Sequence, residues 1–155
     1  MAFAATTEEA LAELFDSTIA AMTPRLSYKG AEAWKPTSRE TGQASTTRRF
    51  RQVWKLGGIQ PGGAVGGRNI ECFAELRIRT DYAGDHAQQQ FIIIDDFYQL
   101  QDTLSALKSA TNTNGIVLVQ GENYEPAEDY DTSTSADVTK IDHVFTVRYI
   151  RSISP

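Results

Sequence analysis

The sequence predicts an α+β domain in which one mainly antiparallel, four-stranded sheet packs against two helices, in the order α-β-β-α-β-β. Two segments carry apolar residues at three- and four-residue steps, which is the spacing of a helix face. The segments predicted as strands alternate apolar and polar residues or are short and apolar. No internal repeat or linker divides the 155 residues, so we expect residues 1–155 to form a single domain with one core.

The first predicted helix begins at a capping signal. Thr6 and Glu9 have the spacing of a capping box, and Glu8 adds negative charge where the helix dipole favours it. Pro24 predicts the end of the helix, because the residue before a proline avoids helical backbone angles. The apolar stripe between these signals consists of Leu11, Leu14, Phe15, Thr18, Ile19 and Met22.

Residues 27–46 have little periodicity and predict an extended arm. Trp34 in this arm has two interpretations. It either anchors the arm to a partner subunit or packs on the protein's own core, where tryptophans are usually largely buried.

Residues 47–56 and 69–82 predict the two strands of a long antiparallel hairpin. One face of the second strand belongs in a core, and the other belongs in water or against a partner. The first face comprises Ile70, Cys72, Ala74, Leu76 and Ile78, and the second comprises Glu71, Phe73, Glu75, Arg77 and Arg79.

The hairpin is interrupted by GGIQPGGAVGG, residues 57–67, which holds six of the 11 glycines. A phosphate-binding loop would need a following Lys-Ser or Lys-Thr and a helix, whereas this segment runs into a strand and Pro61 removes an amide. We expect a long, pliable hairpin loop that orders against a neighbouring subunit, with plain disorder as the alternative.

The second predicted helix covers residues 85–109, with Asp85 as its cap and Gly115 among its stop signals. Asp95 and Asp96 point about 100° apart on a helix, so we expect a solvated face there and no shared ion. The stripe predicted to lie on the sheet consists of Phe91, Ile94, Phe97, Leu100, Leu104 and Leu107. Residues 115–124 and 140–153 predict the last two strands, on either side of a polar, acidic loop.

Composition excludes several classes of protein. The net charge of -5 argues against general affinity for nucleic acid, and no apolar run is long enough to span a membrane. The first residues lack the basic region of a signal peptide. Cys72 is the single cysteine, so an internal disulfide or a cysteine-based zinc site cannot form, and synthesis in a reducing cytoplasm fits best.

No pattern typical of catalysis or ligand chemistry emerges. Asp129 and Asp131 lack the central glycine and final glutamate of a calcium-binding EF-hand. His143 lies in the middle of a predicted strand without a nucleophile elbow, so we expect a structural histidine, and His86 is expected to be solvated. We therefore expect no catalytic residue, no cofactor and no metal, and no enzyme.

The charge layout is more informative. Basic residues gather on or beside the hairpin, and acidic residues gather near the loop between the last two strands. Such opposed zones can meet head to tail and build a ring, or they can be ordinary solvated charges. The predicted subunit or partner interface comprises Trp34, Arg48, Arg49, Gly57, Gly58, Ile59, Gly62, Gly63, Val65, Arg68, Glu125, Glu128, Asp129 and Asp131.

The segments TTEEALAELF, AEAWKP, CFAELRIRTDY, DDFYQLQDTLSALKSA and KIDHVFTVRYIRSI follow one another in the chain. The last of them contains D-x-x-F-x-V-x-Y, formed by Asp142, Phe145, Val147 and Tyr149. In the order of its elements and in the pattern of residues along its strands, this layout resembles the tail terminator proteins of long-tailed bacteriophages over most of the chain.

The resemblance implies a hexameric ring on the head-proximal end of a tail tube, assembled in the host cytoplasm and present in the virion at the tail-neck junction. Such a ring ends tube polymerisation and offers a docking surface to the neck or head-completion protein, and in contractile tails it also contacts the sheath. DNA passes through its lumen without specific binding. The alternatives are a head-completion or neck adaptor protein and, in a different class, a small-ligand- or peptide-binding module.

Because Cys72 shares a strand face with Ile70 and Ala74, its thiol is expected to react slowly with a thiol reagent in the folded protein. The rate of labelling, compared with that in denaturant, checks this expectation. Rapid labelling of the folded protein would contradict the predicted strand register.

Overall fold

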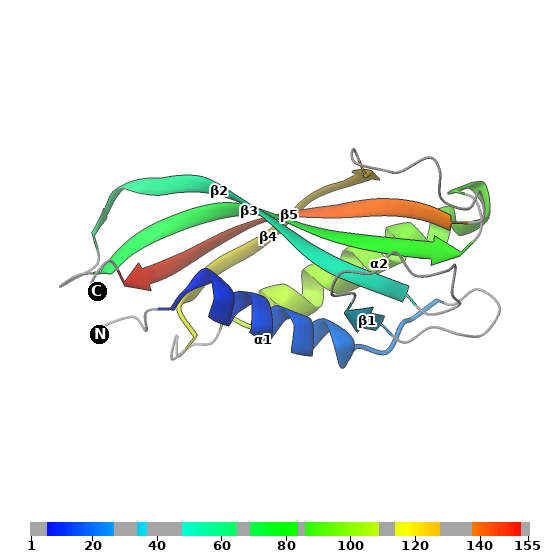
Figure 1. Cartoon of the computed structure of the whole chain (residues 1–155), viewed down its shortest axis with the longest axis horizontal. Coiled ribbons are helices and arrows are strands. Elements are labelled where there is room, and N and C mark those ends of the chain that lie inside the picture. The colour runs from blue at the N-terminus through cyan, green and yellow to red at the C-terminus, as the bar shows by residue number, and fades with distance from the viewer. Residues whose placement is uncertain are drawn as a thin grey trace.

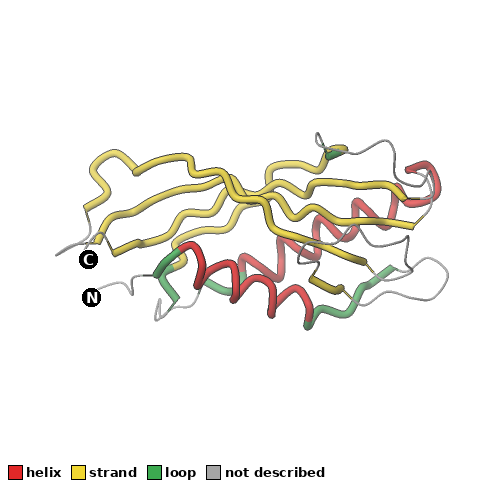
Figure 2. The backbone as a smooth tube through the Cα atoms, viewed as in Figure 1, coloured by secondary structure: helices red, strands yellow, loops and turns green. Residues whose placement is uncertain are grey.

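The computed structural model describes residues 6–26, 34–36, 48–64, 69–83, 86–108, 114–127 and 138–152. Helices α1 (Glu8–Ala20) and α2 (His86–Ser105) lie on one face of a strongly twisted sheet, and no described helix covers the other face (Figure 1). Figure 2 shows the same two layers along the backbone. The predicted α+β class and the order α-β-β-α-β-β of its long elements are confirmed.

The sheet is arranged β1-β2-β3-β5-β4, and the long strands pair antiparallel throughout. Its strands are β1 (Trp34–Pro36), β2 (Arg48–Ala64), β3 (Asn69–Ala83), β4 (Ile116–Pro126) and β5 (Val138–Ser152). The short β1 was not predicted; it comes from the arm and pairs in parallel with the first three residues of β2. The C-terminal strand β5 is an inner strand, so both of its edges are hydrogen-bonded to neighbours.

The glycine-rich segment differs from the predicted loop, because residues 57–64 continue β2. Gly58 is paired with Phe73 and Ile59 with Cys72, and the register shifts after each of Leu56 and Ile59. The physical reason is that β3 offers hydrogen-bonding partners to this backbone, while bulges absorb the extra residues. Residues 65–68 lie outside the described part of the chain.

Helix α1 begins one residue later than its capping signal predicts. Thr7 is the N-cap, and its Oγ1 accepts a hydrogen bond from the backbone N–H of Ala10 at 3.2 Å. Thr6 instead donates its backbone N–H to the carbonyl oxygen of Ile150 at 2.9 Å, which ties the start of the chain to β5. The buried stripe of α1 consists of Leu11, Phe15 and Ile19, all within the predicted set.

Helix α2 buries Phe97, Leu100 and Leu104 as predicted, but its first turns differ from the predicted stripe. Phe91, which was predicted to face the sheet, is 71% exposed, whereas Ile93 is completely buried. Asp96 lies on the same buried face, which contradicts the expected solvated position. The apolar run before it supports two alternative stripes, and the correct one passes through a carboxylate that sequence reasoning placed in water. Neither described helix is long and apolar enough to cross a membrane.

Aromatic side chains join the helices to the sheet. Phe15 of α1 stacks on Trp54 of β2, with ring centroids 6.0 Å apart, and Phe97 of α2 stacks on Phe145 of β5 at 5.6 Å. These pairs fix each helix over a particular strand, because aromatic rings bury large apolar area in defined geometries. Cys72 is buried in this core, which confirms the strand register that its predicted slow reaction depends on.

Candidate interaction surface

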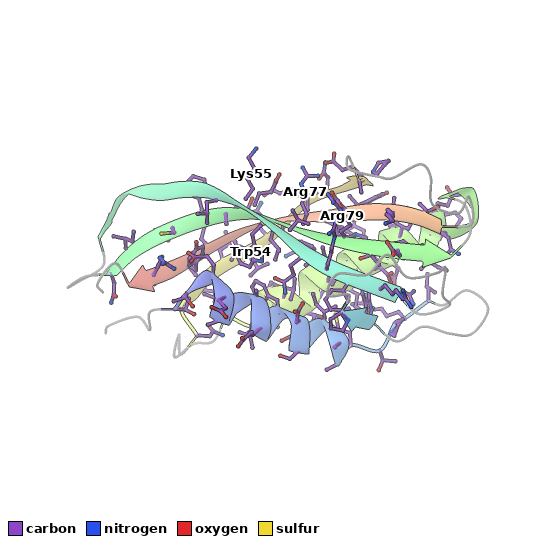
Figure 3. The ribbon with its side chains drawn as sticks, in the orientation of Figure 1. Trp54, Lys55, Arg77 and Arg79 are labelled. Carbon is purple, nitrogen blue, oxygen red and sulfur yellow. The ribbon has the colours of Figure 1, made fainter. Side chains whose placement is uncertain are left out.

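Long polar side chains from the inner strands line the helix-free face of the sheet. Alternate residues of a strand point to opposite faces, so Arg77 and Lys55 lie on this face while Trp54 points toward the helices (Figure 3). This face carries the cross-strand ion pairs, whereas the helix-covered face carries most of the apolar core together with a few buried polar side chains.

Arg77 is the centre of the helix-free face. Its Nη1 lies 2.6 Å from Glu125 Oε1 of β4 and 3.2 Å from Asp142 Oδ2 of β5. Its Nε also donates to Glu75 Oε2, two residues away on β3, at 3.1 Å. Hydrogen bonds to these carboxylates raise the pKa of Arg77 above its already high ordinary value, so its charge is permanent.

Two further ion pairs on this face link β3 to β5. Asp142 is completely buried and accepts a bidentate contact from Arg79, with Nε to Oδ1 at 2.8 Å and Nη2 to Oδ2 at 3.0 Å. Toward the other end of the strands, Arg148 Nη2 lies 2.7 Å from Glu71 Oε1. Paired cross-strand charges of this kind stabilise the register of a sheet.

A shallow depression of about 440 Å³ lies in the middle of the helix-free face. Its rim includes Glu75, Glu122 and Glu125, and Phe73 and Val144 contribute to its lining. Because Glu125 and Glu75 already bind Arg77, and Glu122 accepts a hydrogen bond from Thr146 at 2.9 Å, the carboxylates are largely used within the protein.

The two outer edges of the sheet differ in charge. β1 pairs only with Arg48–Phe50, and no other described strand pairs with the outer side of β2, which carries Arg51 and Lys55 exposed on the helix-free face. β4 forms the opposite edge, without a described strand outside it, and carries Glu122 and Glu125 on the same face. An unpaired edge offers backbone donors and acceptors to another strand.

Arg48 is buried inside the domain and its contacts gather several segments. Its Nε donates to Asp96 Oδ2 at 2.7 Å, and its Nη2 donates to the carbonyl oxygen of Leu26. The guanidinium also lies over the ring of Trp34, 5.6 Å from its centroid. The start of β2 is thereby connected to α2, to the segment after α1 and to β1.

The same network reaches β3 and β5. The hydroxyl of Tyr82 lies 2.8 Å from Asp96 Oδ2 and 2.8 Å from His143 Nε2. If the hydroxyl donates to the carboxylate, it accepts from His143, which assigns the neutral tautomer with its proton on Nε2. Burial lowers the pKa of His143 to about 3, and the positive charge of Arg48 acts in the same direction. Burial raises the pKa of Asp96 to about 6, against the opposing effect of Arg48.

Two residues predicted at a partner interface therefore lie inside the protein. Trp34 and Arg48 are buried, with 1% and 4% of their surface exposed, so the prediction that their side chains contact a partner is wrong. Of the two interpretations of Trp34, packing on the protein's own core is confirmed: its ring meets Phe50 edge-on at 5.9 Å. The reason is that Asp96 supplies a buried counter-charge, next to which Arg48 and the Trp34 ring pack.

The other predicted interface residues fall into three groups. Arg49 is partly exposed on the sheet, opposite Asp81, and Glu125 lies on the helix-free face bound to Arg77. The glycine-rich residues lie in β2 rather than in a loop: Gly57, Gly58, Ile59, Gly62 and Gly63. Val65, Arg68, Glu128, Asp129 and Asp131 lie outside the described residues.

Sequence reasoning missed the buried network of Arg48, Tyr82, Asp96 and His143, and it missed that Arg77 meets Glu125 within one chain. One signal was available, because Asp96 is four residues before Leu100 and eight before Leu104, in the middle of an apolar stripe. The expectation that His143 is a structural histidine is consistent with its burial against Phe97 and Tyr82.

No protein-family model matches this chain, and no curated protein matches it. Within the described residues, no group of histidine, cysteine, aspartate and glutamate side chains is arranged to hold a metal ion. The interpretation of the surface therefore depends on the geometry described above.

Replacing Asp96 with alanine is expected to lower the free energy of unfolding by about 3–5 kcal/mol, because it leaves the buried Arg48 guanidinium without its counter-charge. The matched control is Asp102→Ala on the same helix, whose pair with Arg25 is exposed and contributes less than about 1 kcal/mol. Urea unfolding at pH 7 measures both, and equal losses would contradict a special role for the buried pair.

The stability of the protein is expected to fall between pH 6.5 and pH 4. Below about pH 6.5 a histidine in the unfolded chain takes up a proton, whereas buried His143 does not. Protonation therefore stabilises the unfolded state relative to the folded state, by about 2–3 kcal/mol at pH 4.5. Asp96 acts in the opposite direction, since its raised pKa favours the folded state as pH falls from about 6 to 4. Its pKa shift is smaller than that of His143, so the histidine decides the sign.

The variant His143→Gln isolates the histidine contribution. The difference in unfolding free energy between wild type and variant should shrink as pH falls from 7 to 4.5, whereas a difference independent of pH would show that His143 does not titrate with folding.

Proposed function

We propose that this protein is a structural component of a bacteriophage virion that forms a ring at the head-proximal end of the tail tube. It ends tube polymerisation and presents a docking surface to the neck or head-completion protein. Its partners are further copies of itself, with a hexamer as the expected ring, the tail-tube protein, the neck protein and, in a contractile tail, the sheath protein. Its location would be the tail-neck junction.

The position of the strand that carries the resemblance supports this proposal. Phe145, Val147 and Tyr149 are fully buried on the helix side of β5, and Asp142 is buried on the other side against Arg79. The D-x-x-F-x-V-x-Y pattern thus lies in the middle of the sheet, where the packing of the core requires its apolar side chains.

The observation that carries the proposal is the pair of oppositely charged outer edges on one small domain. A basic edge on β2 and an acidic edge on β4 are different surfaces, so copies joined through them form a heterologous contact, which builds a ring when its rotation closes. The net charge of -5 is compatible with a lumen through which DNA passes without specific binding.

A small-ligand-binding module receives less support. The depression on the helix-free face is shallow, and hydrogen bonds to Arg77 and Thr146 already use its carboxylates. A ligand would have to break these contacts or bind without them.

The proposal is tested by adding the purified protein to polymerising tail-tube subunits of the same virion and measuring tube lengths by electron microscopy. Tubes should shorten as the protein concentration rises, with a ring of density at one end. An unrelated acidic protein of similar size is the control. Unchanged tube lengths with bare ends would overturn the proposal, and a ring that binds the head portal but not the tube would point instead to a neck adaptor.

A further inference from the structure

The two outer edges of the sheet have opposite strand directions. β2 is antiparallel to β3, β3 to β5 and β5 to β4, so β4 runs antiparallel to β2. A second copy placed beside β4 by a rotation about an axis along the strands keeps its own strand direction. Its β2 would therefore meet β4 of the first copy as an antiparallel neighbour, which is the pairing used throughout the rest of this sheet.

The side chains on the helix-free side of these edges are complementary in charge. Lys55 is exposed on β2 opposite Glu75, and Glu125 lies on β4 opposite Asp142, so both belong to the helix-free face. When a sheet continues from one copy into the next, its faces are preserved. Lys55 of one copy would consequently lie on the same face as Glu125 of the other.

The side chains on the helix side of these edges are both apolar and exposed. Leu56 is 67% exposed on β2, in register with the core residue Ala74. Tyr124 is 36% exposed on β4, in register with His143, and contacts Phe97 at 5.8 Å between ring centroids. Tyr98 on α2, which is 57% exposed, also contacts Phe97 and widens this apolar patch.

One register satisfies both complementarities. If Tyr124 of one copy is opposite Leu56 of the next, the antiparallel direction places Glu125 opposite Lys55. Residues directly opposite one another point to the same face, so the apolar pair lies on the helix side and the ion pair on the helix-free side. The two pairs constrain the register, because a shift by one residue would place Tyr124 opposite Lys55. An apolar side chain would then be matched with a charged one that belongs to the other face.

We infer that copies of this chain associate head to tail by continuing the sheet, with β4 of one copy paired to β2 of the next in the register Tyr124–Leu56 and Glu125–Lys55. The occupant of each edge is a second copy, because the two edges carry opposite charges on one face and each carries an exposed apolar group on the other. The inference names the contact within the proposed ring and rests on that proposal for its setting. Main-chain hydrogen bonds between the edges would supply affinity, and the two side-chain pairs would select the register.

Cysteine cross-linking tests the register. The double variant Leu56→Cys/Tyr124→Cys should form a ladder of dimers, trimers and larger species on a non-reducing gel after mild oxidation, because opposite residues have Cβ atoms within about 5.5 Å. Each single variant alone should remain monomeric, and a mixture of the two should stop at dimers, since each molecule then has one reactive cysteine. Wild-type protein, with its buried Cys72, measures the background.

Charge exchange tests the ion pair without a cross-link. Lys55→Glu and Glu125→Lys should each weaken self-association measured by sedimentation by about tenfold or more, because each places like charges opposite one another. Mixing the two variants should restore association, since every contact is then between opposite charges. Glu13→Lys, an equal change of charge on an exposed position of α1, controls for net charge and should associate as wild type does. Because Glu125→Lys also removes a carboxylate from Arg77, its urea unfolding is measured alongside to show that the domain stays folded.

The outcomes separate this contact from the proposed function. Ladders from the double variant, together with rescue on mixing, support the contact. If tube length is nevertheless unaffected, the terminator proposal fails while the contact stands. A ring that caps tubes but gives no cross-link between positions 56 and 124 overturns the contact and leaves the terminator proposal standing. A protein that stays monomeric without cross-links at every concentration, with or without tube ends, also overturns the contact, as would dimers formed by either single variant alone.

Discussion

A buried guanidinium imposes the strongest constraint on this structure. Arginine side chains carry a charge in proteins, so the burial of Arg48 requires a carboxylate and further acceptors to be buried with it. Asp96 supplies the charge, the carbonyl oxygen of Leu26 accepts a hydrogen bond, and Trp34 covers the guanidinium. Through Tyr82 and His143 the same network reaches the two inner strands. Helix α2 can therefore dock in only one rotation, with Asp96 inward and Phe91 outward.

The remaining charges of the sheet fall into two groups, those paired on the helix-free face and those on the outer strands. On the helix-free face, Arg77, Arg79 and Arg148 each bind carboxylates of the same chain, so this face is held together by its own ion pairs. A surface neutralised in this way offers little net attraction to a partner, because a competing charge must displace a satisfied one. The outer strands are different, since their exposed side chains are accompanied by backbone edges with which no further strand of the described residues pairs. The proposed ring uses those edges, and Glu125, which already binds Arg77, is the residue of the paired face that it also engages.

The sequence predicted much of the fold and less of the candidate surface. Alternation along β3 correctly separated the buried Ala74 and Leu76 from the polar side, because that pattern depends only on the pleat of a single strand. The glycine-rich segment was misread as a loop, since its strand character comes from pairing with residues 70–73 and not from its own composition. The expected contact between a basic and an acidic zone is realised in part within one chain, where Arg77 meets Glu125.

By itself, then, the sequence determined the class of fold, the order of its elements and the presence of opposed charges, because periodicity, capping and composition act over a few residues. Only the tertiary structure decided which charges are buried and which remain for neighbours. Arg48 and Asp96 are 48 residues apart, and Arg79 and Asp142 are 63 apart. No local pattern records such a partner, and the difference between a solvated and a buried charge depends on what the rest of the chain brings beside it.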